Sequence, residues 1–459
     1  MPADGAAARP RTSPGFAAVA LGLAIGCHTT ADVPAGPEHA VATGDSGSPA
    51  PATAVVAARC HASGAPIPID ETDAGELELG DVVPTVDAYA VGGVHRTAAG
   101  RVAAVMRIPR RVVDGQASDA ASQAARWVDL APTLGDAPPP RLVARAGAGG
   151  ADLVAAAYLR GGGPGDHTAA RQLALVALAP SAASSPPPFL VVPQQHDDSL
   201  GFDLAFVGSA GVVVWDEGAA PARGVIRALS LDANVAGAHD ISPAESDAEL
   251  PRIVVDGAGF VALWIARKAE PSRGDADAPE VPGEPRSFGW LESVRLDAHG
   301  AVLGRARSLT PASGHVSAYD VVALAAPERA LLVVARDDGE SVDGSGGALV
   351  RVRIVGDVPE PPVEYPSDGL GRGAPVLVEG PSSFLGWIGP GEQGRLLALD
   401  PSGAPLGPPS AEDALDDARP LRTLDAPASV SPAGRAVARL LVAVSSGAGA
   451  ALRVLQCQR

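Results

Sequence analysis

The chain has 459 residues, enough for two or three ordinary domains or for one large array of repeats. Glycine (54 residues) and proline (44 residues) are frequent and aromatic residues make up only 3% of the chain, which disfavours long helices and an aromatic-rich core. A net charge of -18 repels the phosphate backbone, so nucleic acids are not expected as partners.

The first 26 residues have the pattern of a secretory signal. Two arginines precede an apolar run at residues 16–25, which is too short to cross a membrane because a spanning helix needs about 20 residues. The run ends in Ala-Ile-Gly-Cys at residues 24–27, which resembles the lipobox of bacterial lipoproteins, although Ala24 stands where that family usually has leucine. The resemblance implies that Cys27 is acylated and becomes the mature N-terminus. The alternative is an ordinary signal peptide that happens to contain a cysteine.

A tether is expected at residues 27–59, which are rich in alanine, proline, glycine and serine and show no apolar periodicity. Within it, GDSGSP at residues 44–49 resembles the nucleophile signature of trypsin-like proteases, but it precedes nearly all of the folded sequence and is interpreted as a chance match. Several acyl chains on Cys27 would anchor the protein essentially permanently. The expected location is therefore the cell envelope, at the outer membrane, with a repeat domain at residues 60–459.

The rest of the chain repeats a unit of short apolar runs separated by turn residues. The clearest unit has four runs, at residues 251–259, 260–267, 288–297 and 302–309. The same order recurs at residues 202–232 and 375–407, and weaker units lie near 82–135, 152–178, 330–355 and 418–459. The chain thus divides into about seven units of variable loop length.

Four-stranded antiparallel units repeated in this way resemble a β-propeller, so the expected fold is an all-β propeller of about seven blades. Tandem β-sandwich domains are the alternative. A helical protein is disfavoured because apolar runs of this length, broken by glycine and proline, cannot complete several helical turns.

Two residue types recur at fixed places in three of the units. A tryptophan falls late in the second run and an aspartate closes the third: Trp215, Trp264 and Trp387, then Asp232, Asp297 and Asp400. We expect the tryptophans to lie in the core between sheets. Two of the aspartates begin Asp-x-x-Gly segments, in which we expect the aspartate to cap its own turn. These segments lack the serine and the Thr-Trp of the repeated turns in sialidase-like propellers, so that resemblance fails.

The last unit ends after its third run, at residues 451–457, and would leave its sheet one strand short. An unpaired edge invites association with other chains, so residues 66–70 or 76–79 are expected to supply the missing strand. If Cys27 is lipidated, Cys60 and Cys457 are the two thiols that remain. In an oxidising compartment we expect them to form a disulfide that closes the ring.

No residue is assigned a catalytic role, and neither a cofactor nor a metal is expected. The nine histidines include no pair at metal-ligand spacing. His95 has no acidic neighbour in sequence and is interpreted as a solvated residue at a strand end. The acidic loop at residues 337–343 has oxygen donors of the kind that Ca²⁺ takes, but it is interpreted as a solvated hairpin loop. The loop residues that could converge on one face are His196, Asp197, His239, Asp240 and His315.

The leading hypothesis is a lipid-anchored extracytoplasmic binding or scaffold protein of the bacterial cell envelope. Its expected contacts are the membrane, through the N-terminal lipid, and a protein or carbohydrate partner. Catalysis is left open and disfavoured. The runner-up is a propeller hydrolase or lyase with a site at the channel mouth, and a structural envelope component is a third hypothesis. The fold alone cannot choose among them, because propellers host many functions.

Overall fold

The computed structural model describes the strands of one compact unit, Ala54–Arg459, and the connections between many of them. The described residues are 59–68, 78–98, 100–113, 126–133, 137–146, 152–161, 171–179, 184–193, 201–219, 223–232, 237–268, 288–324, 330–339, 347–356, 358–367, 369–371, 373–378, 383–411, 418–420, 437–446 and 449–458. The predicted signal peptide, with Cys27, and nearly all of the predicted tether lie outside this set.

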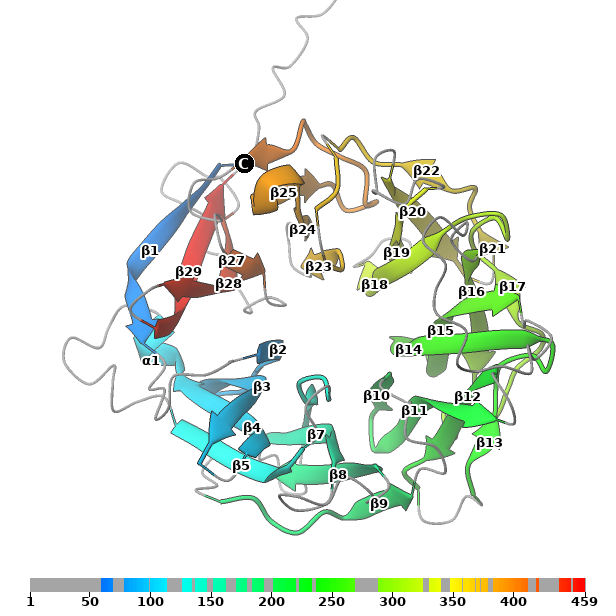
Figure 1. Ribbon diagram of the computed structural model, residues 1–459, viewed down its shortest axis with the longest axis horizontal. Coiled ribbons are helices and arrows are strands. Elements are labelled where there is room, and N and C mark those ends of the chain that lie inside the picture. Colours follow the sequence, from blue (N-terminus) through cyan, green and yellow to red (C-terminus); the bar gives the residue numbers. More distant parts are fainter. Residues whose placement is uncertain are drawn as a thin grey trace, which may run out of the picture. The chain divides into compact units, whose positions relative to one another are not determined.

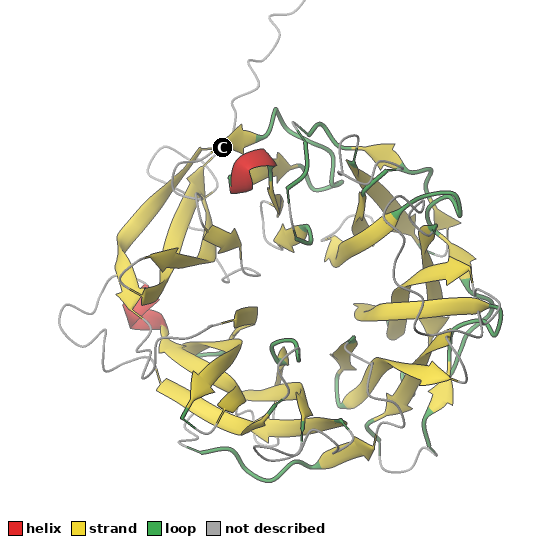
Figure 2. Cartoon of the chain, viewed as in Figure 1, coloured by secondary structure: helices red, strands yellow, loops and turns green. Residues whose placement is uncertain are grey.

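Strands make up almost all of the regular structure among the described residues (Figure 2). The helical elements are a single turn, α1 (Arg110–Val113), and a short 3-10 helix, η1 (Pro390–Glu392). In this part of the chain no helix is both long enough and apolar enough to cross a membrane.

The strands form seven antiparallel sheets, which we number as blades 1 to 7. Blade 1 contains β2 (Glu78–Pro84), β3 (Ala88–Thr97), β4 (Gly100–Pro109) and β5 (Arg126–Pro132). Blade 2 contains β6 (Arg141–Ala146), β7 (Asp152–Arg160), β8 (Gln172–Leu178) and β9 (Leu190–Pro193). Blade 3 contains β10 (Phe202–Val207), β11 (Ala210–Ala219), β12 (Arg223–Ser230) and β13 (His239–Asp240). Blade 4 contains β14 (Ser246–Asp256), β15 (Gly259–Lys268), β16 (Gly289–Leu296) and β17 (Arg307–Ser308).

The remaining three blades follow the same order. Blade 5 contains β18 (Val316–Leu324), β19 (Ala330–Asp337), β20 (Ala348–Val355), β21 (Val358–Pro359) and β22 (Val363–Glu364), the last two both pairing with β20. Blade 6 contains β23 (Val376–Val378), β24 (Ser383–Ile388), β25 (Gly394–Leu399) and β26 (Ser410–Ala411). Blade 7 combines β27 (Ala418–Pro420), β28 (Val437–Ser446) and β29 (Gly449–Gln458) with β1 (Arg59–Pro68).

Each blade packs face to face against the next one, so the blades form a ring (Figure 1). Apolar clusters join blades 1 to 2, 2 to 3, 3 to 4, 4 to 5, 5 to 6 and 7 to 1, and β24 contacts β27 between blades 6 and 7. The all-β propeller predicted from the sequence is therefore confirmed, and tandem β-sandwich domains are not observed.

The N-terminal strand completes the last blade. β1 lies antiparallel to β29, with Arg59 opposite Gln458 and Ile67 opposite Leu452. The first of the two predicted segments, residues 66–70, thus overlaps the strand that closes the ring. Glu78 and Leu79, from the second segment, begin β2 in blade 1 instead.

The two ends of each blade differ. We call the end at which the first strand begins the loop end, because it also holds the connection from the second strand to the third. The opposite end, which we call the turn end, holds the tight turns at Gly257 and Gly300 in blade 4.

The three repeated tryptophans lie in the core, as predicted. Trp215, Trp264 and Trp387 are at most 3% exposed and belong to the clusters between neighbouring blades. Two of them also donate from the indole nitrogen to a carboxylate: Trp215 to Glu217 at 3.2 Å and Trp264 to Glu292 at 3.1 Å. Such bonds satisfy the one polar atom of a buried indole.

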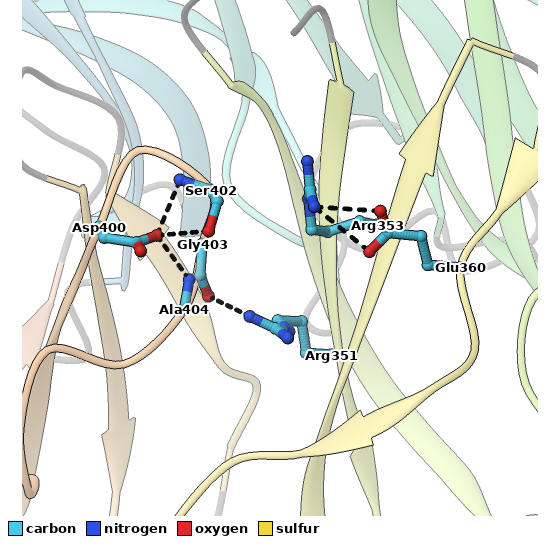
Figure 3. Close-up of polar contacts among 7 residues, drawn as sticks. All are labelled: Arg351, Arg353, Glu360, Asp400, Ser402, Gly403 and Ala404. Atoms are coloured by element: carbon cyan, nitrogen blue, oxygen red, sulfur yellow. Dashed lines mark hydrogen bonds and ion pairs between the residues drawn. The ribbon is translucent and has the colours of Figure 1, made fainter. Parts of the chain in front are cut away.

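The two Asp-x-x-Gly segments form equivalent turns. Oδ1 of Asp400 accepts bonds from the Ser402 hydroxyl and from the backbone N–H groups of Ser402 and Ala404, at 2.7 to 2.9 Å (Figure 3). Oδ1 of Asp297 accepts the corresponding backbone bonds. Gly403 (φ 78°) and Gly300 (φ 82°) take the left-handed conformation, which glycine adopts without steric cost. The predicted self-capped turns are confirmed.

Each of these turns also contacts the preceding blade. The carbonyl oxygen of Gly403 accepts from Nη1 of Arg351 at 3.1 Å (Figure 3) and from the Tyr365 hydroxyl at 2.6 Å. Burial raises the pKa of Tyr365, against a smaller lowering effect of Arg351, so the hydroxyl remains a donor. In Asp400 burial acts to raise the pKa, but the bonds from Ser402 and Ala404 outweigh it and the pKa is lowered. The charged turn is thereby stabilised where it docks.

Carboxylates join the first strands of neighbouring blades. Asp203 of β10 accepts the backbone N–H of Ile253 in β14 at 3.0 Å, and Asp320 of β18 accepts that of Leu377 in β23 at 2.8 Å. Asp81 of β2 accepts from the N–H of Leu142 at 3.3 Å and also pairs with Arg141. All three aspartates are buried. Each therefore satisfies a backbone donor that the next blade leaves unpaired along the inner edge.

We expect Asp320→Ala to lower the free energy of unfolding by about 1–3 kcal/mol, because the buried N–H of Leu377 loses its acceptor. Urea denaturation followed by tryptophan fluorescence measures the change. Asp320→Asn keeps an acceptor oxygen and should lose less. Asp240→Ala, which removes an exposed ion pair with Arg227, should cost less than about 1 kcal/mol. Equal losses in Asp320→Ala and Asp240→Ala would contradict the proposed role.

Candidate functional site

The candidate site lies at the loop end of the junction between blades 4 and 5. Below it, Leu263 and Ile265 of blade 4 pack against Val316 and Val333 of blade 5 in one apolar cluster. The backbones of the two blades are hydrogen-bonded at Gly289, whose N–H donates to the Gly314 carbonyl at 2.8 Å. A Cβ at Gly289 would lie 2.7 Å from the carbonyl oxygen of Val316, so only glycine fits there.

Next to this contact lies a histidine whose side chain has no hydrogen-bond partner among the described residues. His315 forms a parallel bridge with Gly289, and its backbone N–H donates to Oδ1 of Asp337 at 3.2 Å. Its side chain is buried, and neither ring nitrogen has a hydrogen-bond partner among the described residues. A buried polar group left unpaired costs roughly 1–3 kcal/mol. An imidazole with both ring nitrogens unsatisfied therefore calls for an explanation.

An exposed aromatic ring covers that histidine. The centroids of the Phe288 and His315 rings are 5.2 Å apart and their planes are tilted by 30°. Phe288 is 51% exposed, whereas His315 is 7% exposed. The junction thus presents an apolar ring to solvent above a buried polar one.

A second energetic cost lies in β14 of the same junction. Leu250 has φ 54°, the left-handed conformation that costs a non-glycine residue about 1–2 kcal/mol, and it lies in a bulge of β14 between Glu249 and Arg252. Its N–H donates to Asp216 of blade 3 at 2.9 Å. Its carbonyl lies 2.9 Å from the hydroxyl of Tyr319 in blade 5. Both neighbouring blades therefore hold the strained residue in place.

Tyr319 remains a hydrogen-bond donor in this position. Its hydroxyl also lies 2.8 Å from the carbonyl oxygen of Leu263. Burial, and then the negative charges of Asp203 and Asp320, raise the pKa of Tyr319 well above its ordinary value. The phenol is therefore neutral at any physiological pH, and the bulge keeps its support.

An ion pair joins the bulge to the second strand of blade 4. Nε and Nη2 of Arg267 lie 2.8 Å and 2.6 Å from Oε1 of Glu249. The Arg267 side chain is 26% exposed and that of Glu249 is 40% exposed. Nη1 of Arg267 approaches Gly289, next to Phe288. The arginine of this ion pair thus reaches the start of β16, at Gly289.

This arrangement is suited to holding a ligand. Strained backbone and unsatisfied polar groups persist where the surrounding structure enforces them, and they gather at functional sites. The described residues contain no group of three or more His, Cys, Asp or Glu side chains that could hold a metal ion.

Of the predicted loop candidates that the structure describes, only His315 belongs to this junction. His239 lies at the other end of blade 4, where its Nε2 is 3.0 Å from the carbonyl oxygen of Gly300. β16 separates the two histidines, because Gly289 begins this strand beside His315 and Gly300 follows its other end. Eight residues of strand span roughly 23 Å. The expected convergence of His239 and His315 is therefore wrong.

The remaining candidates divide between a structural role and residues that are not described. Asp240 pairs with Arg227 at 3.0 Å on the outer edge of blade 3. His196 and Asp197 lie outside the described residues. In blade 7, Cys60 and Cys457 are opposite one another in the register of β1 and β29. Their side chains are not among those described.

The interpretation of His95 as a solvated residue without an acidic neighbour is wrong. Its Nε2 lies 2.9 Å from Oδ1 of Asp129, and its ring stacks on Trp127 with centroids 5.0 Å apart. The sequence conceals this pair because Asp129 lies in β5, 34 residues away, and pairing through β4 brings it close.

Sequence reasoning also missed most of the junction. The first strand of blade 4 was expected to begin at Pro251, whereas β14 begins at Ser246 and contains the bulge. The proline itself was the available signal, since within a sheet proline is confined to edge strands, the first residue of a strand or bulges. Nothing in the sequence marks Phe288 or Arg267 as neighbours of His315, because they belong to different strands.

The chain was compared with known proteins. No protein-family profile and no curated protein matches it. Its fold is similar to solved structures, including a polysaccharide lyase, the ulvan lyase, in a ligand-bound form (10% identity, 86% of this chain and 95% of that chain, TM-score 0.52) and in a second structure (10% identity, 86% and 93%, TM-score 0.50). Another is the β-propeller domain of the Trilobed protease from Pyrococcus furiosus (9% identity, 84% and 98%, TM-score 0.45). At such identities the likeness concerns the fold alone.

We expect His315→Phe to raise the free energy of unfolding by about 1 kcal/mol, because the ring remains against Phe288 while two unpaired polar atoms disappear. Chemical denaturation measures the change. The matched control is His95→Phe, which removes an imidazole that does have a partner and should lower stability. A loss of stability in His315→Phe as large as that of the control would contradict this reading of the junction.

Proposed function

We propose that this protein is a binding propeller of the bacterial cell envelope, and that its ligand binds at the junction of blades 4 and 5. The observation that carries the proposal is the unpaired, buried imidazole of His315 beneath the exposed ring of Phe288. The strained Leu250 in the same junction supports it, because two independent costs meet at one place.

The envelope location rests on the sequence around Cys27. Acylation there would attach the protein to the outer membrane, and the segment up to residue 59 would act as a tether. β1 begins at the turn end, since Arg59 is opposite Gln458 at the end of β29. The junction lies at the loop end. A chain tethered through residue 59 thus leaves the proposed binding site on the far side from its attachment.

A disulfide between Cys60 and Cys457 is part of the same proposal. Residues opposite one another in an antiparallel pair have Cα atoms about 4.5–5.5 Å apart, which falls within the range of about 4.4–6.8 Å that disulfides span. The register of β1 and β29 supports the pairing, because it sets the two cysteines opposite one another. The bond would fasten the strand that closes the ring.

An extracytoplasmic hydrolase or lyase is the second candidate function. The observation in its favour is again His315, because an imidazole without a partner can take up a proton from a substrate. One observation speaks against an enzyme. The buried aspartates of the inner strands, which could otherwise act as catalytic carboxylates, already accept backbone N–H groups of the next blade. Release of new reducing or unsaturated ends from a bound polysaccharide would favour the enzyme. Binding of a polysaccharide without such release favours the binding protein.

The binding proposal is tested by replacing Phe288 with the photoreactive p-benzoylphenylalanine in the full chain, in cells that produce the protein. Irradiation should join a ligand to position 288. The matched control is Phe189, which is also 51% exposed but lies before β9 in blade 2. Adducts at position 288 and not at 189 are expected. The absence of an adduct at 288, or equal labelling at both positions, would refute the proposed site.

The envelope proposal predicts two features of the mature protein isolated from membranes. Mass spectrometry should find an acylated Cys27 at the N-terminus, and a peptide joined through Cys60 and Cys457 before reduction. Replacement of Cys27 by serine should release the protein from the membrane without changing its fold, because the acyl chains supply the anchor. Two free thiols at Cys60 and Cys457 would eliminate the disulfide.

A further inference from the structure

We propose that the ligand of this junction is a glycan, bound through one sugar ring stacked on Phe288. This inference rests on the proposed function and adds the chemical class of the ligand. It follows from the small size of the apolar surface and from the polar groups that surround it.

The apolar surface of the junction is the ring of Phe288, which is 51% exposed. The axial C–H groups of a pyranose form an apolar face about as large as a phenyl ring. Such a face can lie on the ring of Phe288 and remove it from water.

Polar groups beside the ring match the hydroxyls of a sugar. Arg267 supplies N–H donors and Glu249 supplies carboxylate acceptors, and both are partly exposed. A sugar hydroxyl donates and accepts at once, so it can bridge an arginine and a carboxylate without breaking their contact. Sites for small ligands generally combine an apolar wall with a few such oriented polar groups.

The side chain of His315 can form a further hydrogen bond with a sugar hydroxyl. Among the described residues neither of its ring nitrogens has a hydrogen-bond partner, and the Phe288 ring lies over the imidazole. A shift of that exposed ring toward a stacked sugar would open a path for a hydroxyl or a bridging water to reach a ring nitrogen. The bond formed would offset the cost of the unpaired imidazole.

A protein partner fits this surface less well. The core of a protein–protein interface is a contiguous apolar patch. The other large exposed apolar side chains of the described residues lie elsewhere, on turns, on outer strands or, for Val255, at the turn end of β14: Val86, Phe189, Val191, Val255, Val302, Leu303, Val358 and Val363. Around Phe288 the surface instead carries the charges of Arg267, Glu249 and Asp337.

Affinity electrophoresis tests the inference directly. The full chain is run through native gels that contain dextran, arabinan, alginate or pectin, as neutral and uronate-bearing probes. We expect at least one polysaccharide to retard the protein, and Phe288→Ala to weaken that binding about tenfold or more. Phe189→Ala, which truncates an equally exposed ring, should leave it unchanged. His315→Phe should weaken it while the fold becomes more stable, a combination that a purely structural role would not produce.

The chemistry of the photo-adduct at position 288 separates failure of this inference from failure of the proposed function. A glycan adduct is destroyed by periodate and survives proteases. An adduct that proteases reduce to a partner peptide would overturn the glycan and retain the binding site. No adduct at 288 overturns both. Two results of the electrophoresis also overturn the glycan proposal. One is that Phe288→Ala is retarded as much as the unaltered chain, and the other is that none of the polysaccharides retards the protein.

Discussion

The ring depends on hydrogen bonds that buried aspartates form between the first strands of neighbouring blades. Two adjacent blades share an apolar cluster, and their first strands contact one another, where backbone donors would otherwise remain unpaired. Asp81, Asp203 and Asp320 supply the acceptors, each from an alternate blade. A charged acceptor makes a stronger bond than a neutral one, so a few such contacts set the spacing of the strands.

The candidate site is a consequence of the same constraint. Asp216 extends it to Leu250, whose N–H it accepts, while Tyr319 holds the carbonyl of Leu250 from the other side. Two blades thus hold this residue within the bulge of β14, where Glu249 pairs with Arg267. The strain at Leu250 is therefore enforced by contacts from both neighbouring blades. Groups held in place before a ligand arrives lower the cost of binding it.

Local patterns predicted the parts of the fold that depend on short stretches of chain. Apolar runs separated by turn residues gave the blades, and Asp-x-x-Gly gave turns whose capping bonds involve neighbouring residues only. The short sequence Phe202-Asp203-Leu204, an aspartate between apolar residues of a first strand, was a signal that could have revealed the inter-blade bonds. Its partner, Ile253, lies 50 residues away, so no local pattern identifies it.

By itself, the sequence determined the all-β propeller, the burial of the three tryptophans, and a first strand near the N-terminus that completes the last blade. Each of these follows from composition and from contacts between residues close in the chain, or from the requirement that no edge remain open. Only the tertiary structure decided which histidines share a site. His239 and His315 have similar surroundings in sequence, yet they lie at opposite ends of β16. His95 and Asp129 are 34 residues apart in sequence, yet they form a pair across one strand. Register and blade order set these distances, and both are properties of the closed ring.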